Sequence, residues 1–106
     1  MLKITVVQGR RQRRLIVEGR LIVPWAAELT SAYETARTDL EDRELVVDLR
    51  RLTGISPGGE AILLQLVREE VRFLCGVYTR EVLKQLVTKT SESFREAEDD
   101  AMDSDT

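Results

Sequence analysis

The stretch ELVVDLRRLTGISPGGE, residues 44–60, decides the fold. Its first six residues form a nearly continuous apolar run, which is typical of a strand covered on both faces. Ser56 is a favourable helix N-cap and Pro57 suits the first helical position, so a helix is expected to begin there. The following apolar residues lie on one helical face: Ile62, Leu63, Leu66 and Val67. The unit predicts an open α/β sheet, in which ligands bind at the carboxyl edge of the strands.

The flanking segments predict the rest of the sheet. Aliphatic runs at residues 3–7 and 13–17, separated by a polar segment, indicate an antiparallel hairpin. Residues 71–75 indicate a further strand, and Thr79 is expected to cap a last helix. Apolar residues spaced by three or four predict a helix after Pro24, with a buried stripe of Trp25, Leu29, Tyr33, Ala36 and Leu40. Alternating strands and helices imply a parallel sheet with right-handed crossovers, to which the hairpin adds an antiparallel edge.

Length and charge define the domain organisation. A chain of 106 residues with 42% hydrophobic content can bury one core, which we place in residues 1–90. Residues 91–106 hold seven acids against one arginine, a net charge of −6, and too little apolar surface to offset ordering. We expect this segment to be a disordered tail, or an acidic arm that screens a basic surface. No apolar run approaches the length that spans a bilayer, so a cytoplasmic protein without membrane contact is expected.

The residue inventory argues against catalysis and metal binding. Histidine is absent, which removes the commonest general base and the commonest metal ligand. Cys75 lies in an apolar run and is expected to be a small buried thiol rather than a nucleophile. No phosphate-binding loop, nucleophile elbow or paired carboxylates are present. We therefore predict a protein that is not an enzyme, with no metal and no cofactor.

Several of these segments resemble a STAS domain, the module of bacterial anti-sigma-factor antagonists. The resemblance covers about two-thirds of the chain and rests on VEGRL at 17–21, PWAAEL at 24–29, LVVDL at 45–49, LTGISPGG at 52–59 and ILL at 62–64. It implies an α/β fold with a mixed four-stranded sheet, built from an N-terminal antiparallel hairpin followed by βαβα units. A fifth strand would complete the family pattern; none is visible after the last helix, so the strand number stays open at four or five. It also implies a protein partner, such as an anti-sigma factor or a related kinase-like regulator.

The departures from the family pattern fall at its phosphorylation motif. Ser56 stands at the family's aspartate, Pro57 at its first serine and Gly58 at the phosphorylated serine or threonine. Ile22 replaces a further aspartate. In the family, phosphorylation of that hydroxyl adds charge and expels the partner. Glycine has no oxygen to phosphorylate, so the resemblance implies an interaction module that lacks the usual switch.

Three explanations of the retained motif stay open. The domain binds a partner constitutively through Ser56, Pro57, Gly58, Gly59 and Glu60, which we favour, with the amides of 58–60 turned outward. Alternatively, Ser56 is a relocated phosphoacceptor. Thirdly, the motif is scaffold only, with both glycines required by backbone fit.

A nucleic-acid-binding protein is the alternative from another class. Arg10, Arg11, Arg13 and Arg14 cluster at the expected hairpin tip, where they could contact phosphates. No aromatic residue interleaves with them and the whole chain has a net charge of −3, so we favour solvated hairpin charge. A homodimer formed through an exposed strand edge is a further open expectation.

Overall fold

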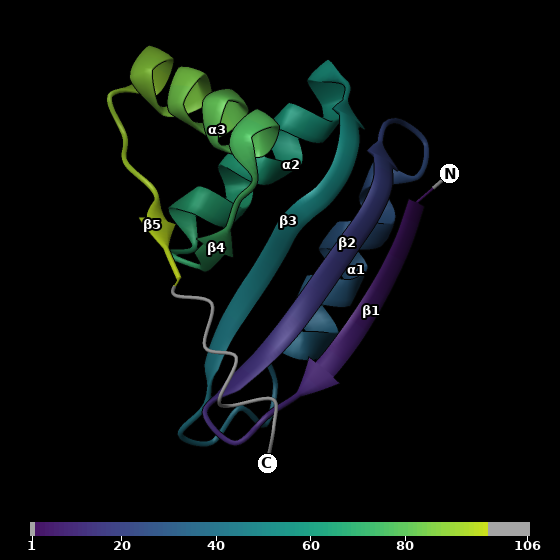
Figure 1. Cartoon of the computed structure of the whole chain (residues 1–106), viewed down its shortest axis with the longest axis vertical. Coiled ribbons are helices and arrows are strands. Elements are labelled where there is room, and N and C mark those ends of the chain that lie inside the picture. The colour runs from purple at the N-terminus through teal and green to yellow at the C-terminus, as the bar shows by residue number, and fades with distance from the viewer. Residues whose placement is uncertain (1, 98–106) are drawn as a thin grey trace.

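The computed structural model describes residues 2–97, which fold into a five-stranded sheet of order β1-β2-β3-β4-β5 and three helices (Figure 1). The α/β class and the N-terminal hairpin are confirmed, and of the two strand numbers left open, four and five, the sheet has five. The elements are β1 Leu2–Gln8, β2 Gln12–Leu21, α1 Ala26–Ala36, β3 Glu44–Ile55, α2 Pro57–Arg68, β4 Arg72–Leu74, α3 Val77–Thr90 and β5 Arg95–Glu96.

The hairpin strands are longer than the sequence indicated. β1 and β2 pair antiparallel from Leu2 opposite Gly19 to Gln8 opposite Arg13. Beyond the expected end at residue 17, β2 continues because it also pairs in parallel with β3, as far as Leu21 opposite Ile55. Gly19 has φ 99°, a conformation that glycine adopts without steric cost. The extension brings the end of β2 beside the start of α2.

β3 continues past the apolar run that predicted it. Its first part is buried on both faces, as expected for a central strand, and Val46, Val47 and Leu49 are fully buried. The second part, residues 50–55, is exposed or half-buried except for Leu52, which belongs to the core. β3 ends at Ile55, and α2 begins at Pro57, so Ser56 alone connects the two elements.

Three sequence expectations about helix ends are wrong. Leu40 is not part of the helical stripe, because α1 ends at Ala36, and it is half-buried. Trp25 is not part of the buried stripe, because α1 begins at Ala26 and Trp25 lies at its N-cap, 38% exposed. Thr79 does not cap α3. Gly76 is the N-cap, and Thr79 lies three residues later, where its Oγ1 accepts a hydrogen bond from the Gly76 amide at 2.9 Å. From this position inside the helix, the Thr79 hydroxyl still stabilises the first turn of α3 by accepting from the N-cap amide.

The sheet also includes residues that the sequence assigned to the tail. β5 pairs in parallel with β4, and the Ala97 amide donates to the Phe73 carbonyl at 2.7 Å. The ring of Phe94 packs edge to face on Phe73, with centroids 6.3 Å apart. The sheet thus extends past the expected domain boundary at residue 90, because Phe94 packs on Phe73 and residues 95–96 pair with β4. Residues 98–106 of the expected tail lie outside the described residues.

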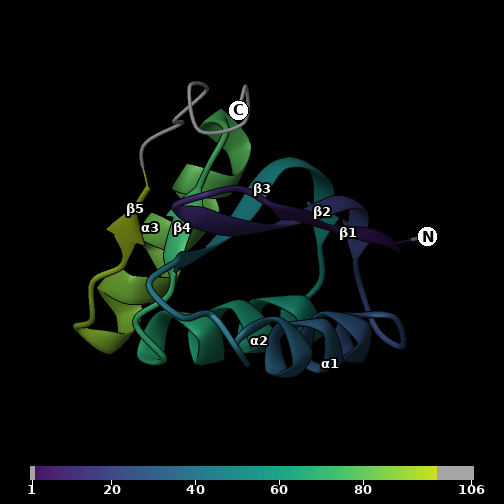
Figure 2. The same ribbon diagram turned by 90° about the horizontal axis from the view of Figure 1, so that it is seen from below.

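The three helices cover one face of the sheet. Right-handed crossovers between sequential, adjacent strands place every connecting helix on the same side, and Figure 2 shows α1 and α2 side by side beneath β1–β3. One core cluster joins side chains of all three helices to the inward positions of the strands, among them Leu29, Leu63, Leu83, Val47 and Phe73. Within residues 2–97, no helix is long and apolar enough to cross a membrane.

Candidate functional site

The start of α2 is built as the sequence predicted. Ser56 has an extended backbone, and its Oγ accepts a hydrogen bond from the Gly59 amide at 3.1 Å, while Pro57 occupies the first helical position. The Ser56 amide donates to the carbonyl of Leu21 at 3.0 Å, which ties the turn to the end of β2. The N-cap role of Ser56 is confirmed.

The first-turn amides differ from the expectation of an anion-binding helix start. The Gly59 amide is bonded to Ser56 Oγ, and the Glu60 amide donates to the Ser56 carbonyl at 2.8 Å. Pro57 has no amide hydrogen. At most one donor of the turn, the amide of Gly58, is left for a ligand. The turn is therefore a poor phosphate cradle, and its helix dipole adds only a weak attraction for negative charge.

Both glycines are explained by close packing. A Cβ on Gly59 would overlap the carbonyl oxygen of Leu21, a backbone atom that cannot move independently of β2. A Cβ on Gly58 would overlap Cγ2 of Val23, which lies in the link between β2 and α1. Any side chain at position 58, a serine or threonine included, would thus press on Val23. Glycine at position 58 thus leaves the room that the side chain of Val23 occupies.

The turn lies on an exposed and largely apolar edge. Val23 is 67% exposed and Trp25 is 38% exposed. Pro57, at the first position of α2, is exposed as well. Gly59 is buried, whereas Gly58 and Glu60 are half-buried. Of the five residues expected to contact a partner, Gly59 is thus the one that is buried. The sequence did not mark Val23 and Trp25 as surface residues, because the helical spacing suggested a buried stripe.

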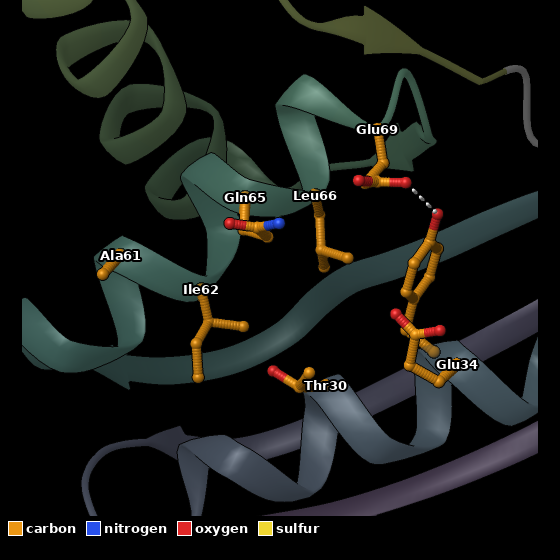
Figure 3. Close-up of a pocket in the computed structure, with 8 residues that line it drawn as sticks. Thr30, Glu34, Ala61, Ile62, Gln65, Leu66 and Glu69 are labelled. Carbon is orange, nitrogen blue, oxygen red and sulfur yellow. Dashed lines mark hydrogen bonds between the residues drawn. The ribbon is translucent and has the colours of Figure 1, made fainter.

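A groove between α1 and α2 begins one residue beyond Glu60 (Figure 3). It has a volume of about 330 Å³, with Thr30 and Glu34 of α1 on one side and Ala61, Ile62 and Gln65 of α2 on the other. At its far end the Tyr33 hydroxyl donates to Glu69 Oε1 at 3.4 Å. Sequence reasoning missed the groove, because it depends on how far apart the two helices pack.

The charges near this groove are compensated. Arg37 lies 3.3 Å from Glu34 and 3.4 Å from Glu69, and its guanidinium is 5.8 Å from the centre of the Tyr33 ring. Burial raises the pKa of Tyr33 above its ordinary value, and the charge of Glu69 adds to the rise, while Arg37 opposes it. Tyr33 is thus a neutral hydrogen-bond donor at neutral pH, and the two carboxylates are ion-paired rather than placed as an acid and base.

The arginine cluster of the hairpin has a structural role. Arg13 Nη1 donates to the carbonyls of Ala36 at 2.7 Å and Thr38 at 2.6 Å, and Nη2 donates to that of Asp39 at 3.2 Å. A cation at the C-terminal end of α1 satisfies carbonyls that the helix leaves unpaired and complements its dipole. Arg14 Nη2 donates to Gln12 Oε1 at 3.1 Å. The geometry therefore removes Arg13 from any phosphate-binding cluster at the tip.

Cys75 is part-buried at the end of β4. Burial, with a smaller contribution from the charge of Glu96, raises the pKa of its thiol to about 11. A thiol with this pKa is almost wholly protonated at neutral pH and is a poor nucleophile.

Comparisons with known proteins bear on the fold. No protein-family model matches the chain, and no curated protein matches its sequence. Two solved structures are similar to it over nearly the whole chain. One is an uncharacterised protein of the DUF3478 family with a SpoIIAA-like fold from Shewanella loihica, with 16% identity, a TM-score of 0.57, and coverage of 98% of this chain and 91% of that one. The other is the anti-sigma factor antagonist SpoIIAA in its unphosphorylated form, with 14% identity, a TM-score of 0.55, and coverage of 92% and 88%.

These similarities agree with the strand order, the N-terminal hairpin and the helix that begins at the edge of the central strand. Sequence identity this low shows the fold alone. The chain has the SpoIIAA-like fold of the STAS domains.

Proposed function

We propose that the protein is a non-catalytic interaction domain that binds a protein partner through the start of α2, and that phosphorylation at position 58 does not control this binding. The surface comprises Ser56, Pro57, Gly58 and Glu60, together with the exposed side chains of Val23 and Trp25. Exposed apolar side chains beside a rigid turn are typical of a protein-binding surface. Gly59 supports the surface by allowing α2 to approach β2.

The partner is proposed from the fold. SpoIIAA is an anti-sigma factor antagonist, and its similarity to this chain supports a partner of the anti-sigma-factor class or a related kinase-like regulator in the bacterial cytoplasm. The single observation that carries the proposal is the coupling of Gly58 to Val23. It explains how the turn can be retained with no hydroxyl at position 58, since valine occupies the space that a side chain there would need.

The test is capture of partners from the native host by the whole protein and by charged variants. Gly58→Asp is made in a Val23→Ala background, which removes the overlapping methyl groups, and Val23→Ala alone is its control. Gln85→Asp, on the exposed surface of α3, controls for added charge elsewhere. We expect Gln85→Asp to retain the partner, Val23→Ala to weaken capture because it removes one apolar contact, and the double variant to lose the partner through repulsion and desolvation. Equal capture by all variants would exclude this edge as the binding surface.

Phosphorylation at Ser56 is the rival form of the same function. The Ser56 hydroxyl is engaged in capping and lies 3.5 Å from the Leu21 carbonyl, which favours a structural role. Intact-mass measurement of the native protein checks this, and we expect the unmodified mass. Stoichiometric phosphate on Ser56 would contradict constitutive binding and would indicate that phosphorylation of Ser56 controls the interaction.

A further inference from the structure

β1 forms an outer edge of the sheet, and no other strand of residues 2–97 pairs with its free side (Figure 1). It pairs with β2 residue for residue from Leu2 to Gln8, without a bulge. Its sequence, LKITVVQ, holds no proline and one charge, Lys3. Prolines, bulges and charged side chains are the usual devices that stop an edge strand from pairing with another chain. β1 therefore presents a regular edge that is open to a further strand.

The opposite edge of the described sheet is protected against such pairing. β5 consists of Arg95 and Glu96, both exposed and both charged. Arg95 lies 3.1 Å from Glu70, and Glu96 lies 2.8 Å from Arg80. A short, charged strand is a poor template for a further strand. Of the two edges, β1 is thus the one suited to association.

The free backbone groups of β1 belong to alternate residues. The Gly9 amide donates to the Gln12 carbonyl at 2.8 Å, so the backbone of Gly9 faces β2. Because this direction alternates along an antiparallel strand, the backbone groups that face away from β2 are those of Leu2, Ile4, Val6 and Gln8. A second strand can form hydrogen bonds to these four residues.

The side chains of β1 leave apolar surface exposed at this edge. Leu2 is buried in the core, and Ile4 packs against it. Val6 projects from the same face as Leu2 and Ile4 by alternation, yet it is 52% exposed. Val7, on the other face, is 40% exposed. An added strand would cover the exposed surface of both valines.

We propose that β1 pairs with β1 of a second copy of this chain, antiparallel about a two-fold axis at Thr5. This register pairs Ile4 with Val6 of the other copy and Leu2 with Gln8, so residues with free backbone groups meet each other. It is also the register that pairs all seven residues of β1. Ile4 then covers the exposed Val6, twice by symmetry. The two Thr5 side chains lie side by side, which is a favourable cross-strand pair.

The charges at this edge are compatible with pairing between two copies. Lys3 lies opposite Val7 of the other copy, and its apolar stem can cover that valine. The two copies of Lys3 are then about 13 Å apart along the strands. Arg14, which pairs with Val7 on β2, is two strands from Lys3 of the other copy, at about 10 Å. Both separations exceed the screening length of about 8 Å at physiological salt. Arg10 and Arg11 lie beyond the paired residues.

The size of the interface sets the expected strength. Pairing of a single strand buries little surface, so the dimer is weak and forms as the protein concentration rises. The proposal is independent of the proposed function, which uses the start of α2.

The first test measures the average mass of the full chain by sedimentation equilibrium, between about 10 μM and about 1 mM protein. We expect the mass to rise with concentration from that of the monomer toward twice that value. Val6→Lys should keep the protein near the monomer mass, because it removes the apolar contact and adds charge to the edge. Val77→Lys, the same change at an 81% exposed valine of α3, is the matched control and should associate as the natural protein does.

The second test fixes the register with single cysteines in a Cys75→Ala background. Thr5→Cys places the two thiols in a non-hydrogen-bonded pair, with Cα atoms about 4.5 Å apart, which is within reach of a disulfide. Lys3→Cys places them about 13 Å apart, out of reach. Under mild oxidation we expect the covalent dimer of Thr5→Cys to form at least about tenfold faster than that of Lys3→Cys.

The outcomes separate this interface from others. A mass that stays at the monomer value would overturn the proposal and leave the edge of β1 to a strand of a different protein. Association that Val6→Lys leaves intact, or that Val77→Lys abolishes equally, would place the interface elsewhere. Equal rates of disulfide formation at positions 3 and 5 would exclude the register. The disulfide test does not use Val6→Lys, so loss of folding in that variant cannot decide the result.

Discussion

Two adjacent glycines at the start of α2 have different neighbours, and this difference determines what substitution does at each. Gly59 faces the backbone carbonyl of Leu21, and Gly58 faces an exposed valine side chain. A backbone atom can retreat only if β2 moves with it, whereas a surface side chain can change rotamer. Sequence position alone would treat the two glycines as equivalent.

Gly59→Ala is expected to lower the free energy of unfolding by about 2–3 kcal/mol, because the new methyl group overpacks against backbone. Gly58→Ala should lower the free energy of unfolding by less than Gly59→Ala does. Combining Gly58→Ala with Val23→Ala should restore most of the stability that Gly58→Ala loses. The measurement is the urea midpoint of each variant, with Gly54→Ala as the control, since a Cβ there meets only the flexible side chain of Arg20 at ordinary contact distances. Equal losses at positions 58 and 59 would contradict this account.

Cys75 is expected to resist alkylation in the folded protein. Its pKa of about 11 leaves roughly a hundredfold less thiolate at neutral pH than an ordinary cysteine with a pKa near 9. The rate of reaction with iodoacetamide should rise by about that factor in denaturant. If the rate in the native protein were close to the rate in denaturant, the thiol would be neither buried nor raised in pKa.

At the scale of elements, the C-terminal end of α1 depends on a residue of β2. Arg13 bonds to three carbonyls at and beyond the last turn of α1, at 2.6–3.2 Å. Within the last turn, α1 has no basic residue of its own. The strand thereby supplies the positive charge that many helices carry in their own last turn.

Arg13→Gln is expected to lower the free energy of unfolding by about 1–2 kcal/mol, because charged hydrogen bonds to one part-buried and two exposed carbonyls are lost. Arg10→Gln, at an exposed position of the hairpin turn, is the matched control and should have little effect. Chemical denaturation of both variants gives the comparison. If instead Arg10 and Arg13 matter equally for binding mixed RNA but not for stability, the cluster is a phosphate-binding site.

At the scale of the whole molecule, the sheet separates two different surfaces. The helix side holds the core, the groove and the edge at α2, and the other side holds a buried carboxylate among arginines. Burial alone would raise the pKa of Asp48. Hydrogen bonds from the Arg50 side chain and backbone, with the charges of Arg50 and Arg14, outweigh it and hold the pKa below its usual range.

The lowered pKa of Asp48 predicts a pH-dependent stability. A carboxyl whose folded pKa lies below its unfolded value, about 3.9, stabilises the fold fully above that value and loses its effect as pH falls through the folded pKa. Asp48→Asn should therefore cost about 1–3 kcal/mol at pH 7, and the difference from the natural protein should shrink below about pH 4. Unfolding at several pH values tests this, with the exposed Asp42→Asn as control. A constant difference down to pH 2 would contradict the assignment.

The sequence by itself determined the order of most elements and the capped start of α2, because both depend on local signals. Apolar periodicity within a dozen residues distinguishes strand from helix, and the Ser56–Pro57 pair acts within one turn. The resemblance to STAS domains drew on the same local segments, and the similarity of the solved structures agrees with it.

Only the tertiary structure decided which residues from different elements are in contact. The short β5 exists because Phe94 meets Phe73 and Ala97 bonds to it, across more than 20 residues of chain. The roles of Arg13, Val23 and Gly59 likewise arise from atoms brought together by folding, not from neighbours in the chain. The same holds for the groove between α1 and α2 and for the ion pair of Asp48 with Arg50. Such contacts depend on packing distances between elements, which a pattern of residue types along one element does not encode.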